Sequence, residues 1–537
     1  MKKTVSYLLC FLLLLSLCAP AASALEVREG WIELPHYAAP AAVSENYSAA
    51  AAHILSSLKR GENPIDVSEY HSSKADALSV FVGLLSDHPE YFYIKTGLSY
   101  TYNPATNTLI DITYFETASG DVLEAQKAAL SAAAAEVLAG VGADMTEIEK
   151  ALYLHDTLAL RVAYDYENYD AGSIPDADYT AYGALVDGSA VCQGYAMAFT
   201  FLAKQLGMES CFISSSSMNH GWNAVRIDGK WYYLDVTQDD AILSMHGSYV
   251  YNADIGHSLF LLSESELTAA GYASDRQIIS LEHRDISCTD SLDGAGYLWQ
   301  ERGRGPFFYA GGRWYYAEGG TVYHAKIDQS DRQIYYQAPN AYGYSRFRMQ
   351  GGRLYYNTRD EVYAVSLSGG LAVVLAAENG GTIVGLGFCP DGRLMYEGFD
   401  DANRYYRRFI TLDSAAEDVT AQIAALPWFV TASDRTAVEA ARTAYNALPA
   451  DRQADVSNLP VLEEAERILR ELDTGLPFKT GDVNRDRMIS VSDVVALRQI
   501  ILLGGDGYVY DFTDIDGDRK ITVTDVVALR RLILDAA

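Results

Sequence analysis

Helix-like and strand-like spacings of apolar residues alternate over the first half of the chain. Apolar positions recur at every third or fourth residue in four segments, which predicts four helices; these segments are 46–59, 75–86, 121–140 and 146–160. Two other segments, YFYI and LIDITYF, have the aromatic and β-branched content of strands and cover residues 91–94 and 109–115. Residues 25–285 are therefore expected to form a domain of mixed helices and strands.

The pattern changes to aromatic strands with glycine turns at about residue 286. A glycine turn followed by alternating residues occurs three times, as GGRWYY, GGRLYY and DGRLMY, with copies starting at 311, 351 and 391. A constant spacing of 40 residues indicates one supersecondary unit per copy, as in a propeller blade. A closed propeller usually has at least about four blades, so an open ring or a hidden fourth blade is expected. Aromatic residues at period two mostly pack, which favours a spacer over a glycan- or protein-binding face for residues 286–412.

Residues 413–473 are rich in Ala, Glu and Arg at helical spacing and are interrupted by Pro427, Pro449 and Pro460. They resemble the small three-helix spacer modules of Gram-positive surface proteins and predict a small helical bundle. A linker, TGLPFKT at 474–480, leads to a final domain at 481–537.

The final domain contains a duplicated loop and helix. Residues 482–503 and 514–535 match at 13 of 22 positions. Oxygen-bearing side chains stand at loop positions 1, 3, 5, 9 and 12, which is the spacing of calcium loops. These residues are Asp482, Asn484, Asp486, Ser490 and Asp493 in the first copy, and Asp514, Asp516, Asp518, Thr522 and Asp525 in the second. Met488 and Lys520, at position 7, would each offer a backbone carbonyl.

Two such loops, each followed by one helix and ending in Asp, resemble a dockerin. The resemblance implies two calcium ions and a cohesin domain of a scaffold protein as partner. It places the recognition positions at Val491-Ser492 and Val523-Thr524, with Arg498 and Arg530 on the helices. Arg487 and Arg519 replace the usual glycine at position 6, and a left-handed turn there would cost about 1 kcal/mol.

The net charge and the N-terminal segment indicate which partners and which location to expect for the protein. The net charge of −30 excludes nucleic acid and anionic membranes as partners, since both would repel it. Residues 1–24 have a basic start, an apolar run and the small-residue site Ala22-Ser23-Ala24, which predicts a cleaved signal peptide. No later apolar run is long enough for a transmembrane segment, so a secreted, soluble protein is expected.

Four cysteines follow the signal segment, namely Cys192, Cys211, Cys288 and Cys389. They do not form a disulfide-rich framework, and the sequence leaves the pairing of the last three open. Cys192 lies after the turn VDGSA, at the start of a segment with helical spacing that ends near Gly207. A thiol in the first turn of a helix is favoured as a thiolate by the helix dipole. Cys192 is therefore a candidate nucleophile, although a lone cysteine on an apolar face more often belongs to a core.

The segment NHGWNAVRIDGKWYYLDVT supplies a base and an orienting group. Asp228-Gly229 is a strong signal for a two-residue hairpin turn, which places Trp222 opposite Asp235 and His220 opposite Thr237. Cross-strand neighbours share a face, so the imidazole is expected beside the Asp235 carboxylate. Together with Cys192 these residues predict a Cys-His-Asp arrangement.

The motifs VCQGYA, HGWNAV and WYYLDVT resemble the transglutaminase-like superfamily, and HPEYFY, LHDTL and TAYGALV resemble its secreted bacterial branch. The resemblance implies an α+β papain/transglutaminase-like catalytic domain over 25–285. It makes Cys192 the nucleophile, His220 the base and Asp235 the group that orients it, without a catalytic cofactor. The family pattern has alanine where Gly221 stands and tryptophan where Gln238 stands. His155 and Asp156, in LHDTL, are expected to be structural.

These features predict a multidomain, dockerin-tethered enzyme that acts on peptide or protein amides by acyl transfer through a thioester. Hydrolysis is favoured, as in a cysteine peptidase, and crosslinking through an amine stays open. A non-catalytic adaptor that binds protein or glycan is the alternative. Dockerins commonly tether enzymes of polysaccharide catabolism, but no pair of catalytic carboxylates indicates a glycan hydrolase.

Overall fold

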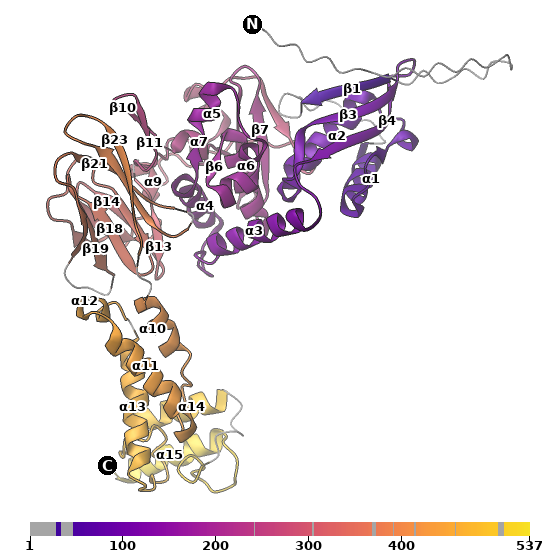
Figure 1. Ribbon diagram of the computed structural model, residues 1–537. Coiled ribbons are helices and arrows are strands. Elements are labelled where there is room, and N and C mark those ends of the chain that lie inside the picture. Colours follow the sequence, from indigo (N-terminus) through magenta and orange to yellow (C-terminus); the bar gives the residue numbers. More distant parts are fainter. Residues whose placement is uncertain are drawn as a thin grey trace. The chain divides into compact units, whose positions relative to one another are not determined.

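The computed structural model describes most of the chain (Figure 1). The described residues are 28–33, 47–240, 242–302, 305–367, 372–389, 391–412, 415–456, 458–502 and 510–536. The expected signal peptide, residues 1–24, lies outside them. The chain separates into two compact units, of which the first comprises Met1–Pro339 with Gly387–Asp391 and the second comprises Asn340–Leu386 with Gly392–Ala537.

An antiparallel sheet with strand order β1-β3-β4-β2 opens the first unit. Its elements are β1 (Arg28–Glu33), α1 (Tyr47–Arg60), β2 (Ile65–Asp66), η2 (Ser68–Tyr70), α2 (Lys74–Asp87), η3 (Pro89–Tyr91), β3 (Ile94–Asn103) and β4 (Thr108–Glu116). The helices expected at 46–59 and 75–86 and the strand at 109–115 are confirmed. The strand expected at 91–94 is wrong except at Ile94, because Pro89 begins a 3₁₀ turn.

A long helix, α6, packs against a second antiparallel sheet of order β12-β7-β8-β9. Its main elements are α3 (Gly120–Leu138), α4 (Glu147–Arg161), α6 (Cys192–Gln205), β7 (Ser210–Ser215), β8 (His220–Ile227), β9 (Lys230–Leu234) and β12 (Arg276–Ile279). The helices expected at 121–140 and 146–160 are confirmed as α3 and α4. Shorter elements connect them: β5 (Ala163–Tyr164), α5 (Tyr166–Ala171), η4 (Asp176–Tyr179), η5 (Gly183–Asp187), β6 (Ser189–Ala190), α7 (Val236–Asp239), β10 (Leu243–Met245), β11 (Ser248–Val250), α8 (Glu264–Ala269) and α9 (Leu298–Arg302).

The two faces of the second sheet bury separate hydrophobic clusters. Val225, Ile227 and Leu234 join the large core that also contains α4 and α6 residues. Trp222 and Tyr233 belong to a smaller cluster with Cys211, Leu267 and Cys288. Both faces are covered, so the sheet is a rigid support for side chains at the ends of its strands.

Each 40-residue repeat forms its own antiparallel sheet. The strands are β13 (Phe308–Ala310), β14 (Arg313–Glu318), β15 (Thr321–Ala325) and β16 (Gln333–Gln337); β17 (Phe347–Gln350), β18 (Arg353–Asn357), β19 (Glu361–Ser366) and β20 (Val373–Ala377); and β21 (Thr382–Phe388), β22 (Leu394–Phe399) and β23 (Tyr405–Ile410). The sheets formed by the described residues are open, so the propeller-like arrangement is not confirmed. The first repeat packs into the core of the first unit, where Trp314 Nε1 donates to Glu149 Oε1 at 3.0 Å.

The second unit continues with helices. The segment expected to be a helical bundle contains α10 (Ala415–Ala424), η6 (Ala432–Asp434), α11 (Arg435–Ala447), α12 (Ala450–Gln453) and α13 (Leu459–Asp473). The helices α10, α11 and α13 share one hydrophobic cluster. The last domain contains α14 (Val491–Leu502) and α15 (Val523–Ala536), each of which begins at position 10 of a predicted calcium loop. No helix within the described ranges has the length and apolar character that a membrane span requires.

Candidate active site and calcium loops

Cys192 is the first residue of α6, as expected, and its side chain is half-buried. Val191 is the N-cap residue, and its backbone N–H donates to the Asp178 carbonyl at 2.9 Å. Gly194 lies against the same carbonyl, where an added Cβ would stand 2.3 Å from the oxygen. The first turn of α6 is thus held close to residue 178, and only glycine fits at position 194 without moving the turn that carries the thiol.

His220 and Asp235 are brought together by the hairpin β8–β9. Ile227 pairs with Lys230 around the Asp228-Gly229 turn, as expected. His220 Nε2 donates to Asp235 Oδ2 at 2.5 Å. The expectation that His220 would lie opposite Thr237 is wrong, because Asp235 ends the strand and becomes the N-cap of α7.

The third member, Cys192, borders the same cleft as His220 and interacts with its imidazole. Nε2 of the imidazole is bonded to Asp235, so Nδ1 is the nitrogen left to face the thiol. Burial alone would lower the pKa of His220, but the charge of Asp235 and the bonds to Asp235 and Cys192 raise it to about 10. The imidazole therefore carries its proton at neutral pH, which favours a thiolate beside it.

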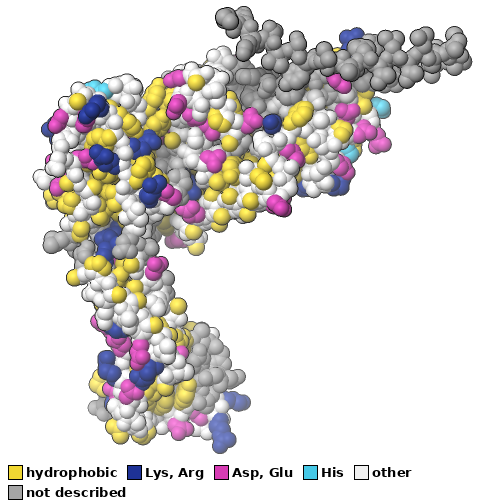
Figure 2. Space-filling model, in the orientation of Figure 1, with side chains coloured by type: hydrophobic (Ala, Val, Ile, Leu, Met, Phe, Trp, Pro, Cys, Tyr) yellow, Lys and Arg dark blue, Asp and Glu magenta, His cyan; other side chains and the backbone are white. Residues whose placement is uncertain are grey.

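Cys192 and His220 border a cleft of about 300 Å³, and Asp235 is buried behind His220. Cys192, His220 and Gly221 form part of its wall, and Tyr164 and Tyr169 supply aromatic surface. Acidic side chains are spread over the face that Figure 2 shows and do not gather in one patch. The cleft is large enough for an extended peptide segment or a side-chain amide.

Two tyrosines at this site were not anticipated from the sequence. The Tyr272 hydroxyl donates to Asp235 Oδ2, and its ring meets Trp222 edge-on at a centroid distance of 4.9 Å. Asp235 Oδ1 accepts from the Gln238 backbone N–H at 3.2 Å, so both carboxylate oxygens are fixed. Burial and then the charge at Cys192 raise the pKa of Tyr164, which keeps that hydroxyl protonated. Neither tyrosine lies in a local pattern that marks a site.

The two departures from the family pattern have distinct surroundings. An alanine Cβ at Gly221 would lie 2.4 Å from Cε2 of the Phe212 ring, so glycine makes room for this ring beside the cleft. At Gln238 the backbone N–H contacts Asp235, whatever the side chain. The substitution at 238 is therefore compatible with the His220–Asp235 pair.

His155 and Asp156 belong to a fully buried network behind the site. His155 Nδ1 lies 2.8 Å from Asp156 Oδ1, and its Nε2 lies 3.3 Å from Asp239 Oδ2. His257 Nε2 donates to the same Asp156 oxygen at 2.8 Å. Burial would lower the pKa of His155, but the two carboxylates raise it to about 9. The network is an ion-paired imidazolium between two carboxylates.

The network also supports the catalytic segment. Asp239 accepts from the Leu259 backbone N–H at 3.1 Å, and the Asp235 backbone N–H donates to the Leu259 carbonyl at 3.0 Å. The same loop is thereby tied to both ends of α7. His155, Asp156 and His257 do place three ligand-type atoms within 4.8 Å of one another, but a proton on each imidazole accounts for the two 2.8 Å contacts to one oxygen.

The two predicted calcium loops have matching backbone hydrogen bonds. In the first copy the Asp493 carboxylate accepts from the backbone N–H groups of Asn484 and Ser490 at 3.0 and 2.7 Å. In the second copy Asp525 accepts from Asp516 and Thr522 in the same way, at 3.2 and 2.9 Å. The left-handed turn at position 6 is present in both copies, with φ of 66° at Arg487 and 63° at Arg519.

The oxygens of both loops suit a hard cation. Asp514, Asp516 and Asp525 bring carboxylate oxygens within 4.8 Å of one another. Asp482 is buried, and its Oδ1 has no hydrogen-bond partner. Burial and then the charge of Asp493 raise the pKa of Asp482, as expected for carboxylates crowded without a cation. Asp486, Asp518, Ser490 and Thr522 stand in the same loops, while the backbone of Met488 and Lys520 occupies position 7.

Comparisons with known proteins match two regions of the chain. A family model described as the transglutaminase-like superfamily matches residues 132–236, a span that includes Cys192, His220 and Asp235. A second, described as the dockerin type I domain, matches residues 480–534. The comparison with curated proteins gives no match.

Two solved structures have partial similarity to the chain. One is a transglutaminase, 16% identical with a TM-score of 0.20, and the match covers 25% of this chain and 36% of that chain. The other is a candidate cysteine protease from Cytophaga hutchinsonii, 16% identical with a TM-score of 0.18, covering 27% of this chain and 54% of that chain. The chain thus spans about a third and about half of the length of these two proteins.

Proposed function

The chain carries a transglutaminase-like domain and a type I dockerin domain, and from this premise we propose that it is a secreted cysteine enzyme of acyl transfer. Cys192, His220 and Asp235 are its catalytic residues, and peptide or protein amides are its substrates. The observation that carries the proposal is that His220 is hydrogen-bonded to the Asp235 carboxylate and borders one cleft together with the Cys192 thiol.

The first half-reaction forms a thioester. The Cys192 thiolate attacks the amide carbonyl carbon, and the electron pair of the C=O bond moves to oxygen. The protonated His220 then gives its proton to the leaving nitrogen as the C–N bond breaks. Asp235 keeps the imidazole oriented and stabilises its positive charge, and Tyr272 and Gln238 hold Asp235 in turn.

Two groups are placed to stabilise the oxyanion. The backbone N–H of Cys192 is at the first position of α6, where helix N–H groups have no intrahelical acceptor. The Tyr164 hydroxyl is the second donor we propose, because it borders the cleft, interacts with Cys192 and stays protonated. Both donors would act on the carbonyl oxygen, so their role does not depend on which amine leaves.

The second half-reaction releases the acyl group. Neutral His220 takes a proton from the acceptor, whose oxygen or nitrogen bonds to the thioester carbon while the C–S bond breaks. Water as acceptor gives hydrolysis, and an amine gives crosslinking. We favour hydrolysis, because the motifs HPEYFY, LHDTL and TAYGALV resemble the secreted bacterial branch of the superfamily.

The dockerin locates this activity on a scaffold. It implies a cohesin partner and an extracellular, cellulosome-type association. We propose two calcium ions, one per loop, with a surface for the cohesin that includes Val491 and Val523, which are 69% and 66% exposed. The residues 1–24 would direct secretion, and the β-rich repeats would act as a spacer.

The test uses the full-length chain, casein as substrate and dansylcadaverine as amine. Hydrolysis of the backbone produces new peptide termini, and transfer to the amine produces fluorescent casein; attack on a side-chain amide releases ammonia with either acceptor. Cys192→Ala and His220→Ala are expected to abolish either product. If casein and peptide libraries are turned over equally by wild type and Cys192→Ala, the proposal is wrong and the non-catalytic adaptor becomes the better account.

A further inference from the structure

A second cavity opens directly beside the catalytic cleft. The two cavities share four wall residues: Tyr179, Gln193, Phe212 and Ser214. Gln193, which lines both cavities, follows the nucleophile in the chain, so their shared wall begins one residue after Cys192. A group bound in this cavity can therefore be covalently connected to an amide held at the thiol.

The interior of this side pocket presents mainly carbon. Leu85, Phe92, Met197 and Ile279 supply much of its wall. The hydroxyl of Ser86, which also lines it, donates to the Val82 carbonyl at 3.0 Å and is already satisfied. A buried charged group would have no counter-charge among the residues that line the pocket.

The volume matches one amino-acid side chain. The side pocket holds about 70 Å³, and one water-sized position takes roughly 10–15 Å³. Roughly five to seven such positions lie in the range from a leucine side chain, with four non-hydrogen atoms, to a phenylalanine side chain, with seven. Glycine at 221 allows the Phe212 ring to lie where it separates the pocket from the cleft.

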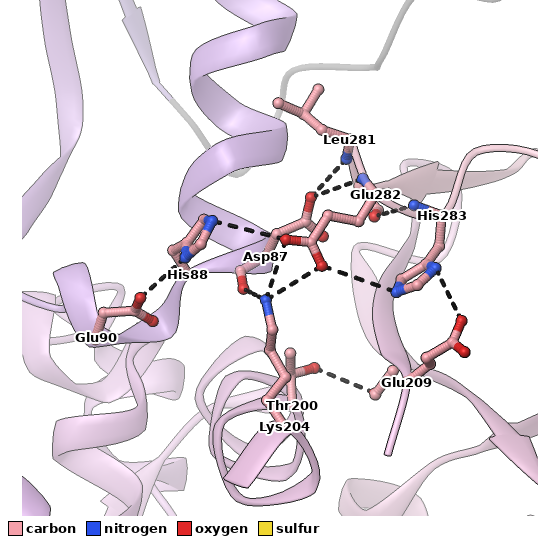
Figure 3. Close-up of polar contacts among 11 residues, drawn as sticks. Asp87, His88, Glu90, Thr200, Lys204, Glu209, Leu281, Glu282 and His283 are labelled. Atoms are coloured by element: carbon pink, nitrogen blue, oxygen red, sulfur yellow. Dashed lines mark hydrogen bonds and ion pairs between the residues drawn. The ribbon is translucent and has the colours of Figure 1, made fainter. Parts of the chain in front are cut away.

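A polar network outside the pocket holds its walls in place. Figure 3 shows Lys204, from α6, reaching the Asp87 carbonyl at 2.5 Å and the Glu282 carboxylate at 3.3 Å. Asp87 Oδ2 accepts from the backbone N–H groups of Leu281 and Glu282 at 2.6 and 3.1 Å. These bonds join the end of α2, the helix α6 and the segment after β12; α2 and α6 line the pocket, as does Ile279 at the end of β12.

We propose that this pocket binds an apolar side chain, of the leucine or phenylalanine type, next to the amide that Cys192 attacks. The inference rests on the proposed function, since it takes Cys192 as the nucleophile. It assigns the substrate class: peptides or proteins with a large apolar residue adjacent to the reacting carbonyl. Burial of such a side chain beside the cleft gives a preference of about tenfold or more over glycine.

The test compares three probes on the full-length protein. N-acetyl-phenylalanine chloromethyl ketone and N-acetyl-glycine chloromethyl ketone both alkylate the thiolate with loss of chloride and differ in one side chain. Iodoacetamide has no amino-acid side chain, so its rate at Cys192 reports the intrinsic reactivity of that thiol. The wild type is expected to react about tenfold faster with the phenylalanine probe than with the glycine probe.

Two substitutions of half-buried Leu85 change the pocket in opposite directions. Leu85→Trp fills it and is expected to reduce the preference to about twofold or less, with the iodoacetamide rate unchanged. Leu85→Ala enlarges it and is expected to favour a naphthylalanine probe over phenylalanine. The two variants shift the preferred size of the probe side chain in opposite directions. If one of them does not fold, the other still tests the pocket.

The outcomes separate this inference from the proposed function. Equal rates for the phenylalanine and glycine probes, with fast His220-dependent iodoacetamide alkylation, would overturn the side-chain pocket and leave the nucleophile in place. Slow alkylation by iodoacetamide that is indifferent to His220→Ala would overturn both. A preference that survives Leu85→Trp would place the specificity elsewhere and refute the assignment of this pocket.

Discussion

Replacement of His155 is expected to remove a pH-dependent part of the stability of the first unit. The pKa of His155 is raised from an ordinary 6.5 to about 9 by Asp156 and Asp239, against the effect of burial. Because the pKa of His155 is higher in the folded than in the unfolded state, its protonation stabilises the folded state. This stabilisation is complete below pH 6.5 and is lost as pH rises to about 9. At about 1.36 kcal/mol per unit of pKa, the loss is about 3 kcal/mol.

The assay is urea unfolding followed by tryptophan fluorescence, since five of the six tryptophans precede residue 340. The measured quantity is the difference in unfolding free energy between wild type and His155→Gln, which cancels the parallel titration of His220. The difference is expected to shrink by about 3 kcal/mol between pH 6 and pH 9.5. The exposed His71, changed to Asn, is the control and should give a difference independent of pH. A constant difference for His155→Gln would mean a neutral imidazole and would refute the ion-paired network.

Three further substitutions test the supports of the two sites. Tyr272→Phe keeps the ring beside Trp222 but removes a donor to a buried carboxylate, so a loss of about 2 kcal/mol in urea unfolding is expected; unchanged stability would contradict it. Gly194→Ala forces the first turn of α6 away from the Asp178 carbonyl, so iodoacetamide alkylation of Cys192 should slow about tenfold, whereas a rate within about twofold would disprove the close fit. The left-handed conformation of Arg519 costs about 1 kcal/mol, and Arg519→Gly removes this cost. The substitution should therefore tighten calcium binding, measured by calorimetry, about fivefold; weaker binding would argue against strain at this residue.

The parts of the candidate site that lie close together in the sequence could be predicted, because turn type and residue spacing determine their positions. The Asp228-Gly229 turn sets the register of β8 and β9, and register alone places His220 and Asp235 on one face. The loop spacing at 482–493 and 514–525 sets the ligand positions in the same way. The prediction that Thr237 lies opposite His220 was wrong, because Asp235 is the N-cap of a helix. An aspartate side chain can start a helix in this way wherever a strand ends.

The remaining features depend on contacts between distant segments. Tyr272 and His257 reach the site from loops with no periodic pattern, so nothing local marks them. The 40-residue period revealed three similar sheets, but closure of a propeller depends on how repeats pack with each other. The expected boundary at 285 also missed that the first repeat shares the core of the first unit, since Trp314 is buried there.

The central claim is that His220 activates Cys192, and the pH dependence of Cys192 alkylation tests it most directly. Iodoacetamide rates would be measured from pH 5 to 10 on the full-length wild type and on His220→Ala, with adducts located by mass spectrometry. We expect the wild-type thiol to react rapidly well below the pH of about 8.5 at which an ordinary cysteine ionises, and His220→Ala to lose this reactivity. A thiol that reacts only above about pH 8.5 in both proteins would contradict the account and identify Cys192 as a structural residue.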